Sequence, residues 1–159
     1  MMAVRTSAGI LLYRQAHAEA GGGVEVWIAH MGGPYWARKE DHAWSVPKGE
    51  FLEPEEPLAA ARREFAEEMG WPPPDAAYVL LGTFRQSSAK SITVFAAEAD
   101  FPGRAINSNT FELQWPPNSG TYQQFPEVDR AGWFTIAEAR SKLVKGQVQL
   151  LDALLRRLG

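Results

Sequence analysis

Three glutamates fall within five positions of a segment whose sequence predicts a helix, Pro57–Met69. Because an α-helix turns by about 100° per residue, Glu64 shares one side of it with Glu67 and Glu68, which follow three and four positions later. Carboxylates this close repel one another and raise each other's pKa. A hard divalent cation relieves that repulsion, since Mg²⁺ takes oxygen ligands and favours carboxylates together with phosphates. The spacing therefore indicates a metal site.

A solvated acidic face is the usual reason for a glutamate-rich helix, and the residues around the glutamates decide between the two interpretations. Gly49 stands six positions before Glu55, and Glu55 stands eight before Arg63. The chain then continues Arg63-Glu64-Phe65-Ala66-Glu67-Glu68-Met69-Gly70-Trp71. These 23 residues from Gly49 to Trp71 resemble the Nudix box, Gly-x5-Glu-x7-Arg-Glu-U-x-Glu-Glu-x-Gly-U with U apolar, at every position. At ordinary residue usage, the seven fixed residues would coincide by chance on the order of once in 10⁸ registers.

The resemblance implies a hydrolase that cleaves a phosphoanhydride bond with a divalent cation, Mg²⁺ or Mn²⁺. It implies that the glutamates of the helix bind the metal and that the carbonyl of Lys48 is a further ligand. Glu55 and Arg63 match residues that brace the loop against the helix, which orients the groups that touch the metal. The helical wheel places Arg63 away from the carboxylates, which agrees with a bracing role. The metal set is Glu64, Glu67, Glu68 and Lys48.

Carboxylates outside the box are further candidates for the site. A carboxylate near the metal can take the proton of an attacking water, and either Glu64 or an outside residue could be this base. Glu127 lies in a stretch that resembles the segment before the last strand of many Nudix enzymes, where a glutamate often binds metal. We therefore predict a catalytic and metal-binding role for Glu127. Glu112 lies near Trp115 in a long loop and is a candidate for substrate contact; the alternative for both is a surface glutamate.

Several residues in predicted loops could bind the rest of a substrate. Large aromatic residues there could stack on a nucleobase or could cover the core, and a cation could contact a phosphate. The aromatic candidates are Tyr35, Trp36, Trp115 and Tyr122, and the cationic candidates are Arg38, Lys39 and Lys90.

Resemblance beyond the box suggests the substrate. The tract from Trp36 to Gly49 is similar to hydrolases of dinucleoside polyphosphates, and the segment from Ser108 to Pro117 resembles bacterial predicted pyrophosphohydrolases. The prediction is a nucleoside diphosphate linked to another moiety, best a dinucleoside polyphosphate. The alternatives are a MutT-like nucleoside triphosphate pyrophosphohydrolase and a non-catalytic Nudix-fold regulator that binds nucleotides. Such regulators usually lose box glutamates, and here all are present.

The elements that must position these residues can be predicted from periodicity. Strands are expected over residues 6–13 and 24–30, paired as a hairpin, and over residues 78–85, 91–97 and 132–135. Besides Pro57–Met69, helices are expected over residues 136–144 and 148–158. The acidic helix should pack on the sheet through Leu58, Ala61, Phe65 and Met69. Residues 103–126 are expected to form a long loop of the kind that often covers a ligand. The resemblance implies an α/β fold with a mixed β-sheet sandwiched between helices.

Composition limits the class of protein. A chain of 159 residues fits a single domain, predicted over residues 1–159. Its net charge of −3 argues against nucleic-acid binding, so the expected partner is a small nucleotide. The absence of cysteine excludes disulfides and a thiolate nucleophile. No signal-peptide pattern and no apolar run of about 20 residues is found, so neither a membrane span nor export is expected and a cytoplasmic location is predicted. The oligomeric state stays open.

Overall fold

The computed structural model describes residues 5–16, 23–102 and 105–159. Its main feature is a seven-stranded mixed sheet in which neighbours run in the order β3-β2-β1-β6-β5, with β4 paired to β1 and β9 paired to β2. β1 runs parallel to β6 and antiparallel to β2 and β4. The strands are β1 (Arg5–Gln15), β2 (Val24–Met31), β3 (Trp44–Ser45), β4 (Lys48–Glu50), β5 (Val79–Ser87), β6 (Lys90–Glu98) and β9 (Val128–Thr135).

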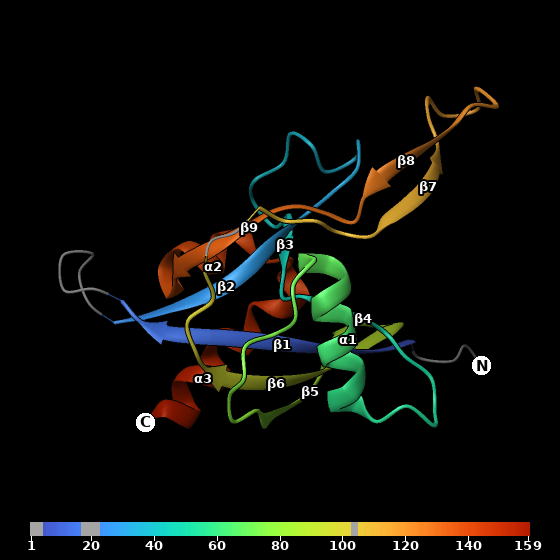
Figure 1. Ribbon diagram of the computed structural model, residues 1–159. Helices are drawn as coiled ribbons and strands as arrows, with labels where there is room; N and C mark the ends of the chain where they lie inside the picture. Colours follow the sequence, from blue (N-terminus) through green and yellow to red (C-terminus); the bar gives the residue numbers. More distant parts are fainter. Residues whose placement is uncertain (1–4, 17–22, 103–104) are drawn as a thin grey trace.

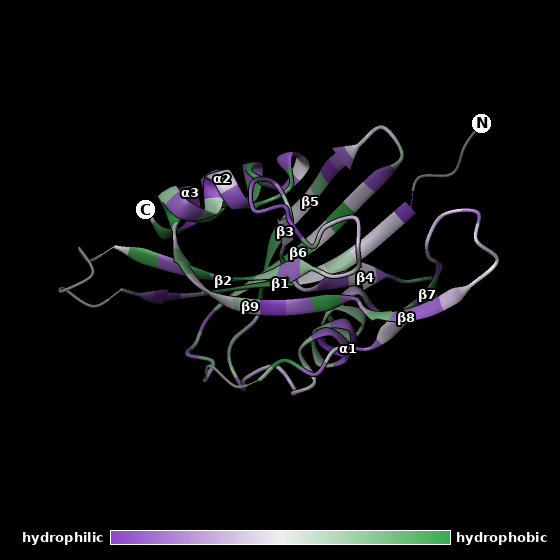
Figure 2. Ribbon diagram, turned by 90° about the horizontal axis from the view of Figure 1, so that it is seen from above, coloured by the Kyte–Doolittle hydropathy of each residue, from purple (hydrophilic) through white to green (hydrophobic). Residues whose placement is uncertain are grey.

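Helices cover both faces of this sheet, which confirms the predicted fold class (Figure 2). On one face lies α1 (Pro57–Met69); on the other lie α2 (Ile136–Lys142) and α3 (Gln149–Leu158), separated by the short 3-10 helix η2 (Lys145–Gln147). The alternation of β1 feeds both cores, because successive side chains of a strand point to opposite faces. Ile10 and Leu12 pack on the α1 side, whereas Leu11 packs on the α2 and α3 side.

Helix α1 has the bounds that the sequence predicts. Pro57 opens it, and Gly70 closes it with φ 78° while donating its N–H to the carbonyl of Ala66. Phe65 and Met69 are fully buried, and the Trp27 indole N–H donates to the Met69 sulfur at 3.3 Å. The predicted apolar stripe is wrong at its first member, since Leu58 is only half-buried and Ala60 lies in the core instead. Each large side chain in this face stabilises the helix–sheet contact by roughly 1.5–3 kcal/mol.

The structure differs from the sequence prediction most within residues 103–126, which were expected to form a loop; residues 103 and 104 lie outside the described part of the chain. A hairpin of β7 (Thr110–Gln114) and β8 (Tyr122–Pro126) forms a separate two-stranded sheet that projects from the body (Figure 1). The Phe111 and Phe125 rings, 6.1 Å apart, lie at opposite positions on the two strands. The alternation that makes these strands is only five residues long in each, and Asn-, Ser- and Pro-rich flanks conceal it. The predicted helix over 148–158 also begins later, at Gln149, after η2.

No helix in the described part of the chain is both long enough and apolar enough to cross a membrane. The predicted cytoplasmic location stays a prediction.

Candidate metal and nucleotide site

Helix α1 presents Glu64 and Glu68 toward β4. Glu64 is buried, with 9% of its surface exposed, while Glu67 and Glu68 are half-buried. The backbone N–H of Lys48 donates to the Glu68 carboxylate at 3.1 Å. Gly49 lies so close to the Glu64 carboxylate that a β-carbon at this position would overlap it. Lys48 and Gly49, the first two residues of β4, therefore contact the acidic side of α1 directly.

Arg63 holds this cluster together. Its guanidinium makes a two-pronged contact with Glu55, from Nε and Nη2 at 2.9 Å each. Its Nη1 also donates to Glu64 at 2.8 Å and to Glu67 at 3.3 Å. The contact with Glu55 is the brace that the box resemblance implies. The helical-wheel expectation that Arg63 points away from the carboxylates is wrong, because a long arginine side chain can reach back along the helix surface.

The electrostatics of the site favour a bound cation. Burial raises the pKa of Glu68 to about 8, against a lowering by Lys48, and repulsion from Glu127 and Glu64 adds to the rise. Burial is also the main cause that raises the pKa of Glu64 and of Glu127, and Glu67 adds to both shifts. By contrast, the hydrogen bonds from Arg63 lower the pKa of Glu55. A nearby positive charge stabilises the ionised form of carboxyl groups whose pKa is raised in this way.

These donors fit a hard divalent ion. All side-chain donors are carboxylate oxygens from Glu64, Glu67, Glu68 and Glu127, a set that suits Mg²⁺ or Mn²⁺ and not the nitrogen and sulfur ligands typical of zinc. As they stand, no three acidic or histidine side chains of the described residues close around one point. The Nη1 of Arg63 is hydrogen-bonded to two of these carboxylates, Glu64 and Glu67.

Two adjoining cavities open beside the carboxylates and share Lys48, Glu68 and Glu127 as a common wall. The first, of about 390 Å³, is polar; its other lining residues are Arg5, Ser7, Gly49, Glu50, Glu64, Gln86 and Lys90. The second, of about 290 Å³, is partly aromatic; its other lining residues are Ala29, Met31, Gly32, Trp36, Ser45, Phe111 and Val128. We call them the polar cavity and the aromatic cavity.

The structure brings some of the predicted substrate residues to these cavities and leaves others outside. Trp36 lines the aromatic cavity and Lys90 lines the polar cavity. Tyr35 and Trp115 contact each other edge to face, with ring centroids 5.3 Å apart, and neither is among the described residues that line the two cavities. The Glu112 carboxylate is exposed on β7, where it accepts a hydrogen bond from Gln124 at 3.2 Å. The predicted substrate roles of these last three residues therefore have no geometric support.

Sequence reasoning missed Arg5, Gln86, Met31 and Phe111. Arg5 lies directly opposite Lys90 in the parallel pairing of β1 and β6, a proximity that local periodicity could not reveal. Phe111 reaches the aromatic cavity because its ring packs against Gly33, where a β-carbon would lie 2.8 Å from the ring. The short apolar alternation around Phe111 was the only signal for it.

The chain matches the family model of the NUDIX domain over residues 3–154. An Ap4A hydrolase from C. elegans, solved as a binary complex, superposes with a TM-score of 0.63 at 20% identity, covering 98% of each chain. A mutT/nudix family protein from Listeria innocua superposes with a TM-score of 0.65 at 16% identity, covering 99% of this chain and 96% of the other.

A third structure is the NUDIX domain of NrtR from Shewanella oneidensis with ADP ribose. It gives a TM-score of 0.62 at 16% identity and covers 100% of this chain and 91% of the other. No curated protein sequence matches the chain. At these identities the likeness to solved structures is one of fold.

Proposed function

The chain belongs to the Nudix family of hydrolases, and on that premise we propose that it uses a divalent cation to hydrolyse a phosphoanhydride bond of a nucleoside polyphosphate. The observation that carries the proposal is the common wall of the two cavities. Glu68 and Glu127 stand there, with Glu64 beside them in the polar cavity. A nucleotide lying across this wall would place its phosphates against the carboxylates.

We assign different roles in the reaction to the residues of the box and to Glu127. We assign Glu64, Glu67, Glu68 and Glu127, with the carbonyl of Lys48, to holding the cation. Once bound, the cation would neutralise phosphate charge and lower the pKa of a water molecule. Glu127 or Glu64 would accept the proton of the attacking water, since both carboxylates line the polar cavity beside the assigned metal site. Arg63 and Glu55 would keep the helix and the preceding loop in register.

The linings of the cavities suggest how the substrate lies. Trp36, Met31 and Phe111 offer apolar surface for one nucleobase in the aromatic cavity. The polar cavity has no aromatic side chain among the described residues that line it, and it carries the cations Arg5 and Lys90. These two cations lie at paired positions of the parallel strands β1 and β6, and Arg5 also forms an ion pair with Glu50 at 3.6 Å. An anionic phosphate chain beyond the scissile bond would pair with Lys90 and compete with Glu50 for Arg5.

We therefore place a dinucleoside polyphosphate first among the substrates, as the resemblance of residues 36–49 indicates, and a nucleoside triphosphate second. Both have a chain of phosphates for the polar cavity, and the fold likeness to an Ap4A hydrolase supports the first. A non-catalytic role as a nucleotide-binding regulator is the remaining alternative. Intact box glutamates argue against it.

The test is a side-by-side assay of diadenosine tetraphosphate, ATP and ADP-ribose with Mg²⁺ and with Mn²⁺. We expect both polyphosphates to have a higher kcat/KM than ADP-ribose, whose second ribose offers no charge to Arg5 and Lys90. Removal of metal with EDTA should abolish turnover, and added Mg²⁺ or Mn²⁺ should restore it. Binding of all three nucleotides without hydrolysis would replace this proposal with the regulator.

A change of charge in the polar cavity tests the placement of the phosphate chain. Lys90→Gln should lower kcat/KM for diadenosine tetraphosphate about 10–150-fold, because one hydrogen bond to a charged group contributes about 1.5–3 kcal/mol. It should leave kcat/KM for ADP-ribose within about twofold. Arg157→Gln is the matched control, since Arg157 is an exposed cation near the end of α3. An equal loss on both substrates would contradict the placement.

A further inference from the structure

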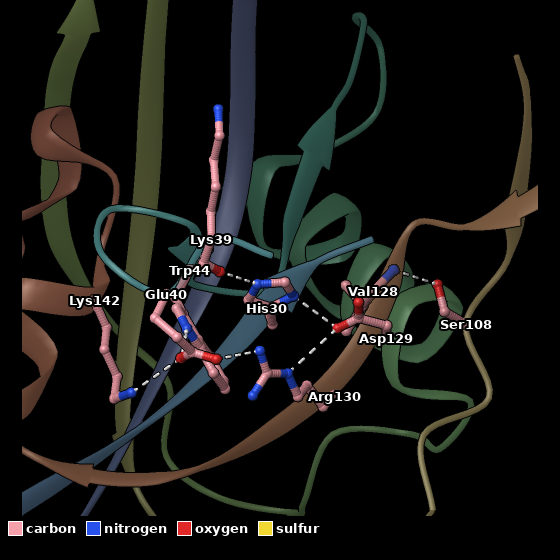
Figure 3. Close-up of polar contacts among 9 residues, drawn as sticks. All are labelled: His30, Lys39, Glu40, Trp44, Ser108, Val128, Asp129, Arg130 and Lys142. Atoms are coloured by element: carbon pink, nitrogen blue, oxygen red, sulfur yellow. Dashed lines mark hydrogen bonds and ion pairs between the residues drawn. The ribbon is translucent and has the colours of Figure 1, made fainter. Parts of the chain in front are cut away.

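His30 of β2 is fully buried, and both of its ring nitrogens have oxygen partners. Nδ1 lies 2.8 Å from the Asp129 carboxylate, and Nε2 lies 2.7 Å from the carbonyl of Lys39 (Figure 3). A backbone carbonyl only accepts hydrogen bonds, and so does an ionised carboxylate. Nε2 therefore donates to the Lys39 carbonyl, and Nδ1 stands at hydrogen-bond distance from the Asp129 carboxyl group.

Asp129 occupies a β-bulge in β9. His30 pairs with Arg130 and Met31 pairs with Val128, so that Asp129 is the extra residue between them. Bulges occur next to active sites, where they re-aim a side chain. Here the bulge turns the Asp129 carboxylate toward His30, as Figure 3 shows. The His30–Asp129 pair therefore holds the point at which β9 changes register.

The residues just before the bulge belong to the site. The carbonyl of Glu127 accepts the N–H of Gly32 at 2.8 Å, and the N–H of Glu127 donates to the carbonyl of Asn109 at 2.9 Å. The next N–H, of Val128, donates to the Ser108 hydroxyl at 3.1 Å. Hydrogen bonds thus fix the Glu127 backbone on both sides of its Cα. The register of the bulge therefore determines the position from which the Glu127 side chain extends.

Nε2 of His30 contacts a different part of the site, the turn from Trp36 to Lys39. Lys39 closes a turn in which its N–H donates to the carbonyl of Trp36 at 3.0 Å, and Trp36 lines the aromatic cavity. The hydrogen bond from His30 to the carbonyl of Lys39 fixes this turn to β2.

We propose that His30 is a positioning residue that acts through two contacts, which we call the Asp129 arm and the Lys39 arm. The arm through Asp129 places Glu127 and acts on kcat; the arm through Lys39 places Trp36 and acts on KM for the nucleotide. The link to kcat and KM rests on the proposed function, whereas the positioning itself does not. Loss of a hydrogen-bond partner behind a metal ligand typically costs about 10–100-fold in activity or metal affinity.

A second set of contacts also reaches the same turn and supplies the control. Glu40 accepts hydrogen bonds from Arg130, from Lys142 at 3.4 Å and from the Trp44 indole at 3.3 Å (Figure 3). Its side chain is half exposed, and ion pairs of that kind contribute little because water and salt screen them. Glu40→Gln should therefore change neither arm appreciably.

The test uses two substitutions of His30, by asparagine and by glutamine, whose side-chain amides each reproduce one nitrogen of the imidazole ring. His30→Asn offers a donor near the position of Nδ1 and keeps the Asp129 arm; His30→Gln offers one near Nε2 and keeps the Lys39 arm. Hydrogen–deuterium exchange, read without any substrate, should show faster exchange over residues 126–130 in His30→Gln and over residues 36–40 in His30→Asn. Glu40→Gln should resemble the wild type.

Kinetics with diadenosine tetraphosphate and Mg²⁺ complete the experiment. His30→Gln should lower kcat about tenfold with KM within twofold of the wild type, and His30→Asn should raise KM about tenfold with little change in kcat. Asp129→Ala changes a partly exposed side chain and should lower kcat in the same way. It tests the Asp129 arm even if the substitutions at the buried His30 impair folding. Equal loosening of both segments in both amide variants would show that His30 is only a core residue and would overturn the proposal. A wild type without turnover would instead count against the proposed function, and the exchange data would still decide the role of His30.

Discussion

Replacing Glu68 with glutamine should lower kcat/KM at saturating Mg²⁺ by at least about 100-fold. The change keeps the size of the side chain and its hydrogen bond from the Lys48 N–H, but it removes one charge from the group of carboxylates assigned to the cation. The loss should exceed the 10–100-fold that is typical for an outer partner of a metal ligand. Glu56→Gln is the matched control, because Glu56 is an exposed glutamate immediately before the same helix. Turnover of Glu68→Gln equal to that of Glu56→Gln would remove Glu68 from the site.

The same substitution should stabilise the protein when metal is absent. Burial raises the pKa of Glu68 to about 8 from an ordinary value of 4.5, so between these two pH values the folded protein keeps a proton that the unfolded chain releases. The free energy of unfolding therefore falls as the pH rises from about 4.5 to about 8. Glutamine has no proton to lose and escapes this penalty. In EDTA, Tm of Glu68→Gln should exceed that of the wild type at pH 8, and the two should converge at pH 4.5; a Tm below wild type at pH 8 would contradict this account.

Gly49→Ala should abolish most activity while leaving the fold intact. The added methyl group would overlap the Glu64 carboxylate, and the end of a flexible side chain can move where a backbone cannot. The fold should therefore survive with a small change in Tm. Glu64 would be displaced from the position assigned to it, and we expect a loss of kcat/KM on the order of 100-fold, the upper end of the loss that is typical when an outer partner of a metal ligand is removed.

Two controls isolate the collision with Glu64. Gly132→Ala introduces a methyl group that meets only the Phe134 ring, at an ordinary 3.5 Å, and should be neutral. In the background of Glu64→Ala, which removes the carboxylate, Gly49→Ala should cause no further loss, because contacting residues are not additive. If Gly49→Ala lowers activity by the same factor in both backgrounds, Gly49 acts by another route.

The sequence by itself determined the acidic helix and the chemistry attached to it. The bounds Pro57–Met69 and the shared side of the glutamates depend on neighbours within a few turns of chain, and the Glu55–Arg63 brace was implied by the Nudix resemblance. A helix closes its hydrogen bonds four residues apart, so local spacing predicts which residues share a side of it, although it did not predict that Arg63 reaches Glu64 and Glu67. The Nudix resemblance was carried by the same short stretch, and the fold class followed from it.

Only the tertiary structure decided what surrounds that helix. Arg5 meets Lys90 because β1 and β6 pair in parallel, and the two residues are 85 positions apart in the chain. His30 meets Asp129 because of a one-residue bulge in β9, and Phe111 reaches the aromatic cavity through a hairpin that looked like a loop. Strand order and register are set by long-range pairing, and shifting a strand by one residue sends every side chain to the opposite face. The alternation along each strand is the same for many pairings, so no local pattern could reveal which cations, aromatic rings and buried charges the fold would bring together.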